Sequence, residues 1–134
     1  MEQKSYMLIV LKSSIDPSYA PVGAAHASLA GYLKWEDDEL TYHWANHIFN
    51  KHIKMATPEE FEKAKDDKYG DKIVITESGL DNEEIAIVYR IKENYAGFLK
   101  TLPKWKIMAC KNPEKRAAAI EAKSKLGVSI NDRK

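Results

Sequence analysis

The sequence predicts an α/β protein, a three-layer sandwich in which a mixed sheet of about four strands is flanked by helices on both faces. Two observations lead to this fold class. Short runs rich in Val and Ile alternate along the chain with segments of helical periodicity, which is typical of strands joined by helical crossovers. The last two of these runs are joined by the short connection 78–83, so we expect them to be antiparallel neighbours.

The chain has the length of one domain of ordinary size. Its 134 residues can bury roughly two-thirds of the surface that the unfolded chain exposes. We assign residues 1–111 to a single α/β domain and residues 112–134 to a basic C-terminal helix and tail. With 44% hydrophobic and 31% charged residues, the composition is that of a soluble globular protein.

The N-terminal part opens with a strand and a helix of small residues. The unbroken apolar run within residues 5–12 predicts a strand that is buried on both faces. Pro21 suits the first position of a helix over 21–35, and the many Gly and Ala residues let this helix lie close against the sheet. One stripe of the helix is formed by Val22, Ala25, Leu29 and Leu33. A second helix is expected near 39–49, where apolar residues recur at helical spacing.

The middle of the chain contains a short strand followed by a well-defined helix start. Residues 51–56 are expected to form the strand. Thr57 suits the N-cap of the next helix and Pro58 its first position, and Glu60 completes a capping box. We expect this helix to end near Gly70, because glycine readily terminates a helix.

The second half supplies two further strands and two further helices. Residues 72–77 and 84–91 are rich in β-branched residues and predict strands. A helix is expected near 93–101, and residues 105–109 fit either an edge strand or packed coil. An Ala-rich helix is expected over 112–127.

Cysteine usage and hydropathy indicate a cytoplasmic protein. Cys110 is the only cysteine, so no internal disulfide can form. The longest apolar run is about six residues, far below the ~20 that span a bilayer, and we expect no membrane association. The segment 1–4 leads directly into the first expected strand, which leaves no room for a signal peptide.

The charges are divided unevenly along the chain. Residues 104–134 carry nine Lys or Arg against three acids, a net charge of +6, which leaves −5 on residues 1–103. A basic tail can bind a phosphate backbone, remain solvated, or dock on the acidic body of a neighbouring subunit. A tryptophan between two lysines can stack on a base, although such a residue more often packs inward. The candidate nucleic-acid contacts are Lys104, Trp105, Lys106, Lys115 and Arg116.

Several short motifs follow one another in a characteristic order. They are the pair His26-Ala27, then Trp44, the strand Ile53 to Ala56 with the helix start Pro58-Glu59-Glu60, and the segment Glu77-Ser78-Gly79. In this order and spacing, over residues 5–107, the chain resembles the peptidyl-tRNA hydrolase 2 family. The resemblance implies that family's α/β sandwich, an activity on peptidyl-tRNA, tRNA as a partner, and pairing into a homodimer.

The chain departs from the family at most of the positions that carry its chemistry. The loop 17–21 has no lysine where the family has one, and Gly23 stands where the family has glutamine. The family's aspartate corresponds to Glu77, and its threonine falls near Asp81. Only His26 is retained unchanged.

The resemblance implies that the start of the first helix meets the end of the third strand. The candidate catalytic residues lie at this meeting point. His26 would act as a general base on water, and Glu77 as the carboxylate that orients it. Tyr19 or Ser78 could supply a hydroxyl, and Lys12 is the nearest cation in the sequence. The alternative reading is that His26 is a partly buried helix residue bonded to a backbone carbonyl.

We expect no metal ion and no organic cofactor. His43 and His47 share one helix face, with Glu36 and Glu39 nearby, but zinc needs more ligands in an ordered shell. Both histidines also fit the edge of a buried stripe. The glycines are scattered and form no phosphate-binding loop. No adjacent histidine marks Cys110 as a nucleophile.

Two functions from different classes remain open. The first is a hydrolase that acts on an acylated RNA such as peptidyl-tRNA, or on a small ester or amide. The second is a non-catalytic module that binds RNA or a protein partner on the same fold. The missing lysine favours the second, whereas the retained His26 and acid support the first. An open cleft with His26 within hydrogen-bond reach of Glu77 would favour catalysis, and a His26 sealed under Tyr19 or Tyr32 would not.

Overall fold

A four-stranded mixed sheet forms the middle layer of the protein in the computed structural model, which describes residues 5–95 and 97–105. The strands are β1 (Met7–Lys12), β2 (Lys51–Ala56), β3 (Lys72–Glu77) and β4 (Glu83–Tyr89). They lie in the order β2-β1-β4-β3, with β1 parallel to β2 and the other two pairings antiparallel. The predicted mixed sheet and the antiparallel pairing of its last two strands are therefore confirmed.

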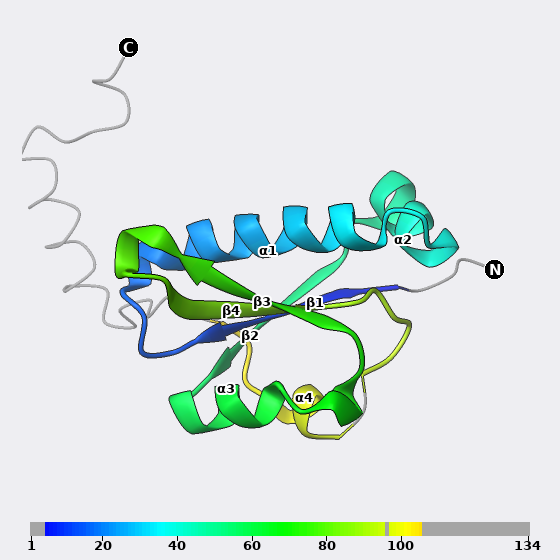
Figure 1. Ribbon diagram of the computed structural model, residues 1–134. Helices are drawn as coiled ribbons and strands as arrows, with labels where there is room; N and C mark the ends of the chain where they lie inside the picture. Colours follow the sequence, from blue (N-terminus) through cyan, green and yellow to red (C-terminus); the bar gives the residue numbers. More distant parts are fainter. Residues whose placement is uncertain (1–4, 96, 106–134) are drawn as a thin grey trace, which may run out of the picture.

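Helices cover both faces of this sheet (Figure 1). The long helix α1 (Ala20–Trp35) lies along one face, over β1, β3 and β4. On the other face lie α3 (Pro58–Ala64) and the short α4 (Phe98–Thr101). A helix α2 (Glu39–His43) follows α1 and continues into a π-helical turn, Trp44–Ile48. Within the described residues no helix combines the length and apolar character needed to cross a membrane.

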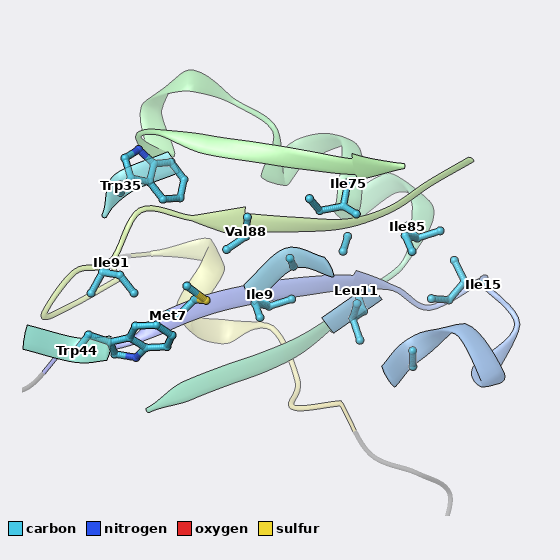
Figure 2. Close-up of a cluster of buried hydrophobic side chains, with 13 residues drawn as sticks. Met7, Ile9, Leu11, Ile15, Trp35, Trp44, Ile75, Ile85, Val88 and Ile91 are labelled. Carbon is cyan, nitrogen blue, oxygen red and sulfur yellow. The ribbon is translucent and has the colours of Figure 1, made fainter. Parts of the chain in front are cut away.

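The two faces of β1 contribute to separate hydrophobic clusters. Met7, Ile9 and Leu11 point to the α1 side, where they pack with other buried residues shown in Figure 2. Leu8 and Val10 point to the α3 side and pack with a second cluster that includes Phe61. Strand β1 is thus buried on both faces, as its unbroken apolar run predicts.

The face of α1 that meets the sheet is formed by its smallest residues. Gly23, Ala27 and Gly31 are buried there, whereas Leu29 and Leu33 are 59% and 58% exposed. A Cβ atom on Gly31 would lie 2.9 Å from Val88 Cγ2, so the helix backbone has no room for a side chain. The apolar stripe recognised in the sequence is therefore mostly turned to solvent, because the close packing of the backbone uses the small-residue face instead.

Two helices are shorter than the sequence predicts. Helix α3 ends at Ala64 rather than near Gly70, because the Asp66 side chain accepts from the Lys68 N–H and starts a separate 3₁₀ turn. The segment near 93–101 is helical only in α4, where Gly97 has a φ of 61° immediately before the helix. Before that glycine, Tyr95 is held by hydrogen bonds to the backbone of Tyr6 and Leu8.

Candidate functional site

His26 and Glu77 face each other where the first helix passes the end of the third strand. Their Nε2 and Oε2 atoms are 3.3 Å apart. The imidazole is 54% exposed and the carboxylate only 13%, so the acid forms the inner partner of the pair. The imidazole is not sealed under Tyr19 or Tyr32. The two residues therefore lie close together, as predicted, and the imidazole is open to solvent.

The chain after β3 fixes the carboxylate of Glu77. This residue ends the strand and caps a 3₁₀ turn, Ser78–Leu80, because its Oε1 accepts from the Gly79 N–H at 3.1 Å. The turn closes through residues with positive φ, and the Asn82 N–H donates to the Glu77 carbonyl at 2.9 Å. One oxygen of the carboxylate is thus held by the backbone while the other meets His26.

Tyr19 belongs to the same site. It ends the 3₁₀ turn Pro17–Tyr19 that leads directly into α1, and it is half-buried against the α1-side cluster. A Cβ atom on Gly79 would lie 3.0 Å from the Tyr19 hydroxyl and 3.3 Å from Glu77 Oε1. Because Gly79 has no side chain, the Tyr19 hydroxyl and the Glu77 carboxylate can both lie close to its Cα atom.

The other two predicted members of the site differ in position. Ser78 adjoins Glu77 in the 3₁₀ turn and is exposed. Lys12, the nearest cation in sequence, extends away from His26, because its ammonium lies 4.7 Å from the centre of the Phe61 ring on the α3 side. The geometry therefore places His26 against Glu77, with the Tyr19 hydroxyl beside Gly79 and with Lys12 outside the site.

The basic residues near the end of the described chain lie at the opposite edge of the sheet. Lys104 forms an antiparallel bridge with Lys54 of β2, whereas Glu77 lies on β3 at the other edge. Trp105 is half-buried and packs against the α1-side cluster, which is the inward arrangement. Lys106, Lys115 and Arg116 lie outside the described residues, as do Cys110 and the segment 112–134.

The two neighbouring histidines of the sequence are in contact with each other. The rings of His43 and His47 have centroids 4.8 Å apart and are tilted by 39°. Within residues 5–95 and 97–105, no group of three or more His, Cys, Asp or Glu side chains is arranged to hold a metal ion.

Sequence reasoning did not identify an apolar groove beside α1. The groove has a volume of about 580 Å³ and is lined by Leu29, Tyr32, Phe49 and their neighbours. Its residues include two of the most exposed large apolar side chains, Leu29 and Phe49. The spacing of Gly23, Ala27 and Gly31, four residues apart, is the signal that could have revealed it. Small residues at that spacing mark the buried face, which leaves the larger apolar residues outside.

Comparison with known proteins leaves the function to be argued from this geometry. No protein-family model matches the chain, and no curated protein matches it. The arrangement of His26 and Glu77 is accordingly the main guide to chemistry. With Glu77 Oε2 within 3.3 Å of His26 Nε2, the carboxylate can stabilise a protonated imidazole, and the other ring nitrogen, Nδ1, can accept a proton from water.

Proposed function

We propose that this protein is a hydrolase of the peptidyl-tRNA hydrolase 2 type that cleaves an acyl ester such as peptidyl-tRNA. His26 acts as the general base and Glu77 as the residue that orients it. The observation that carries the proposal is the 3.3 Å contact between an open imidazole and a carboxylate held by the backbone. The resemblance in the sequence supplies the substrate class, and cysteine usage and hydropathy favour a cytoplasmic setting. Tyr19 completes the reacting surface.

The chemistry requires one water molecule. His26 Nδ1 accepts a proton from the water as its oxygen attacks the acyl carbonyl carbon. The tetrahedral intermediate then breaks its bond to the ribose oxygen, which takes the proton back from the imidazolium. The products are a carboxylic acid and a free ribose hydroxyl, and the Glu77 carboxylate stabilises the imidazolium between the two transfers.

The developing oxyanion needs a donor other than Lys12. Tyr19 presents a hydroxyl beside Gly79, close to the acid of the pair. The Tyr19 hydroxyl thus takes the place of the family's lysine in this proposal.

The test is peptidyl-tRNA hydrolysis by the full chain beside three variants. His26→Ala and Glu77→Gln are each expected to lower kcat by about 10²-fold or more. His47→Ala is the matched control, because it removes an exposed imidazole from the distant π-helical turn. Absence of turnover in the unchanged protein, or equal losses in all three variants, would refute the hydrolase.

A second function is favoured by the groove beside α1. Exposed Leu29, Leu33 and Phe49 present an apolar surface that a catalytic role at His26 does not use. In this alternative, the protein is a non-catalytic module that binds RNA through its basic segments or a protein through the groove. Pairing into the homodimer that the resemblance implies is one way in which this exposed α1 surface could be covered.

A further inference from the structure

A basic pocket lies at the opposite edge of the sheet from the candidate active site. It has a volume of about 380 Å³ and opens beside the first residues of β1, on the α3 side of the sheet. His52 and Lys54 enter it from β2, while Tyr95 and Lys100 come from the later loop and α4. Neither His26 nor Glu77 takes part in it.

Three lysines converge on this pocket from three segments of the chain. Lys54 lies on β2, Lys100 on α4, and Lys104 on the chain that pairs with the β2 edge. The Lys54 ammonium is held in place because it donates to the Leu102 carbonyl at 2.9 Å and the Lys100 carbonyl at 3.3 Å. Glu93 is the one carboxylate among the lining residues, so the pocket has an excess of positive charge. Such an excess favours an anion.

An aromatic pair adjoins these lysines. The rings of Tyr6 and His52 have centroids 4.4 Å apart, and both residues line the pocket. Burial, followed by the charges of Lys54 and Lys104, lowers the pKa of His52 below its usual value. At neutral pH the imidazole is therefore mostly uncharged, which leaves a flat aromatic surface beside a cationic one. Nucleotides combine these two requirements, since every base offers a ring face and every phosphate a negative charge.

We propose that this pocket binds a phosphate-bearing ligand of mononucleotide size, with the phosphate among Lys54, Lys100 and Lys104 and the base against Tyr6 and His52. The volume falls within the range of small-ligand sites. Ammonium groups bind phosphate through charge-assisted hydrogen bonds, and the base supplies the stacking contact. A free nucleoside monophosphate and the 5′-terminal nucleotide of an RNA share this chemistry.

The site is separate from the proposed hydrolase, and its test can fail independently. Binding of adenosine 5′-monophosphate to the full chain is measured by calorimetry, beside inorganic phosphate, adenosine and a 5′-phosphorylated RNA hexanucleotide. The monophosphate is expected to bind at least tenfold more tightly than phosphate or adenosine alone, because only it makes both kinds of contact. Tighter binding of the hexanucleotide would assign the site to an RNA end, and equal or weaker binding to a free mononucleotide.

Three variants locate the binding. Lys100→Gln and Lys104→Gln are each expected to weaken binding of the monophosphate roughly tenfold, since each removes one charged partner of the phosphate. Lys34→Gln is the matched control, an exposed lysine at the end of α1 on the other side of the sheet, and it should bind as the unchanged protein does. No binding at millimolar concentration, or binding that neither pocket variant changes, would overturn the proposal. His26→Ala should leave the affinity unchanged whether or not the hydrolase is active.

Discussion

Gly31 of α1 lies directly against Val88 of β4, so closely that a Cβ atom on the glycine would come within 2.9 Å of Val88 Cγ2. The same position would lie 3.1 Å from Met7 Cε. This contact sets the distance between the helix and the sheet. It also explains why α1 turns its larger apolar residues outward, where they form the groove and the exposed stripe.

Gly31→Ala is expected to destabilise the protein by about 1 kcal/mol, because overpacking against the branched Val88 outweighs the gain in helix propensity. Gly23→Ala is the comparison: its added Cβ would lie 3.1 Å from the end of the longer Ile85 side chain, which can move. We expect that variant to be closer to neutral. Urea unfolding of both gives the order, and a Gly31→Ala protein more stable than the unchanged chain would contradict the packing argument.

Tyr19→Phe is expected to lower kcat for peptidyl-tRNA by about 10²-fold with little change in KM, because its hydroxyl is proposed to act on the developing oxyanion. Tyr42→Phe serves as the control, since Tyr42 is 62% exposed on α2. Steady-state kinetics separates the two parameters. A rise in KM with kcat unchanged would show that Tyr19 contributes to binding and not to the chemical step.

His52 should titrate below its usual pKa, and Lys104→Gln should move that pKa upward, because the variant removes one of the positive charges that lower it. A histidine that resists protonation in the folded protein binds protons more readily when unfolded. The free energy of unfolding therefore decreases as the pH falls through the pKa that His52 has in the unfolded chain. NMR titration of the imidazole measures both proteins, and an unchanged or lower value in Lys104→Gln would contradict this account.

Asp38 joins α2 to the end of β4 through Arg90, whose Nε and Nη2 each donate to one oxygen of its carboxylate. This hydrogen bonding lowers the pKa of Asp38 below the ordinary value of 3.8. The contact therefore stabilises the folded protein at pH values above the pKa of Asp38 in the unfolded chain. This stabilisation is lost as the pH falls through the lower pKa that Asp38 has in the folded protein. We expect Asp38→Asn to cost about 1 kcal/mol at pH 7.

The same variant should cost less at pH 2 than at pH 7, because a larger share of the Asp38 carboxylate of the unchanged protein is protonated at the lower pH. Thermal unfolding at the two pH values compares them, with Asp37→Asn as the control because Asp37 is an exposed neighbour. Equal losses for Asp38→Asn at both pH values would show that the ion pair is not the cause.

If the exposed stripe of α1 forms the expected homodimer, Leu29→Glu should raise the dissociation constant of the dimer at least tenfold, because it places a charge in the apolar contact. Lys34→Glu changes charge on the same helix outside the groove lining and should have a smaller effect. Analytical ultracentrifugation of both variants measures the constant. A monomeric unchanged protein would refute the pairing and leave the groove to another partner.

The candidate site could be predicted only in part. The resemblance directed attention to His26 and Glu77, while Tyr19 and Ser78 were chosen for their hydroxyls. The structure places His26 3.3 Å from Glu77 and the Tyr19 hydroxyl beside Gly79. The sequence alone could not exclude Lys12 from the site. The direction of its side chain depends on which face of β1 it occupies and on its contact with the Phe61 ring. The basic pocket was missed for a similar reason. Lys54 and Lys104 are distant in sequence and meet only because the late chain pairs with the β2 edge.

The amino-acid pattern by itself determined the elements: four strands, a helix of small residues, and the capping box that starts α3. These elements depend on side-chain periodicity and on hydrogen bonds between residues that are close in sequence. Both can be recognised in the amino-acid sequence itself. Only the tertiary structure decided that the leucines of α1 are exposed, that Lys12 lies against Phe61, and that His26 meets Glu77 on an open surface. Those outcomes depend on how closely two backbones can approach and on which residues then share a space. Contacts between distant parts of the chain are settled by packing, and local pattern does not encode them.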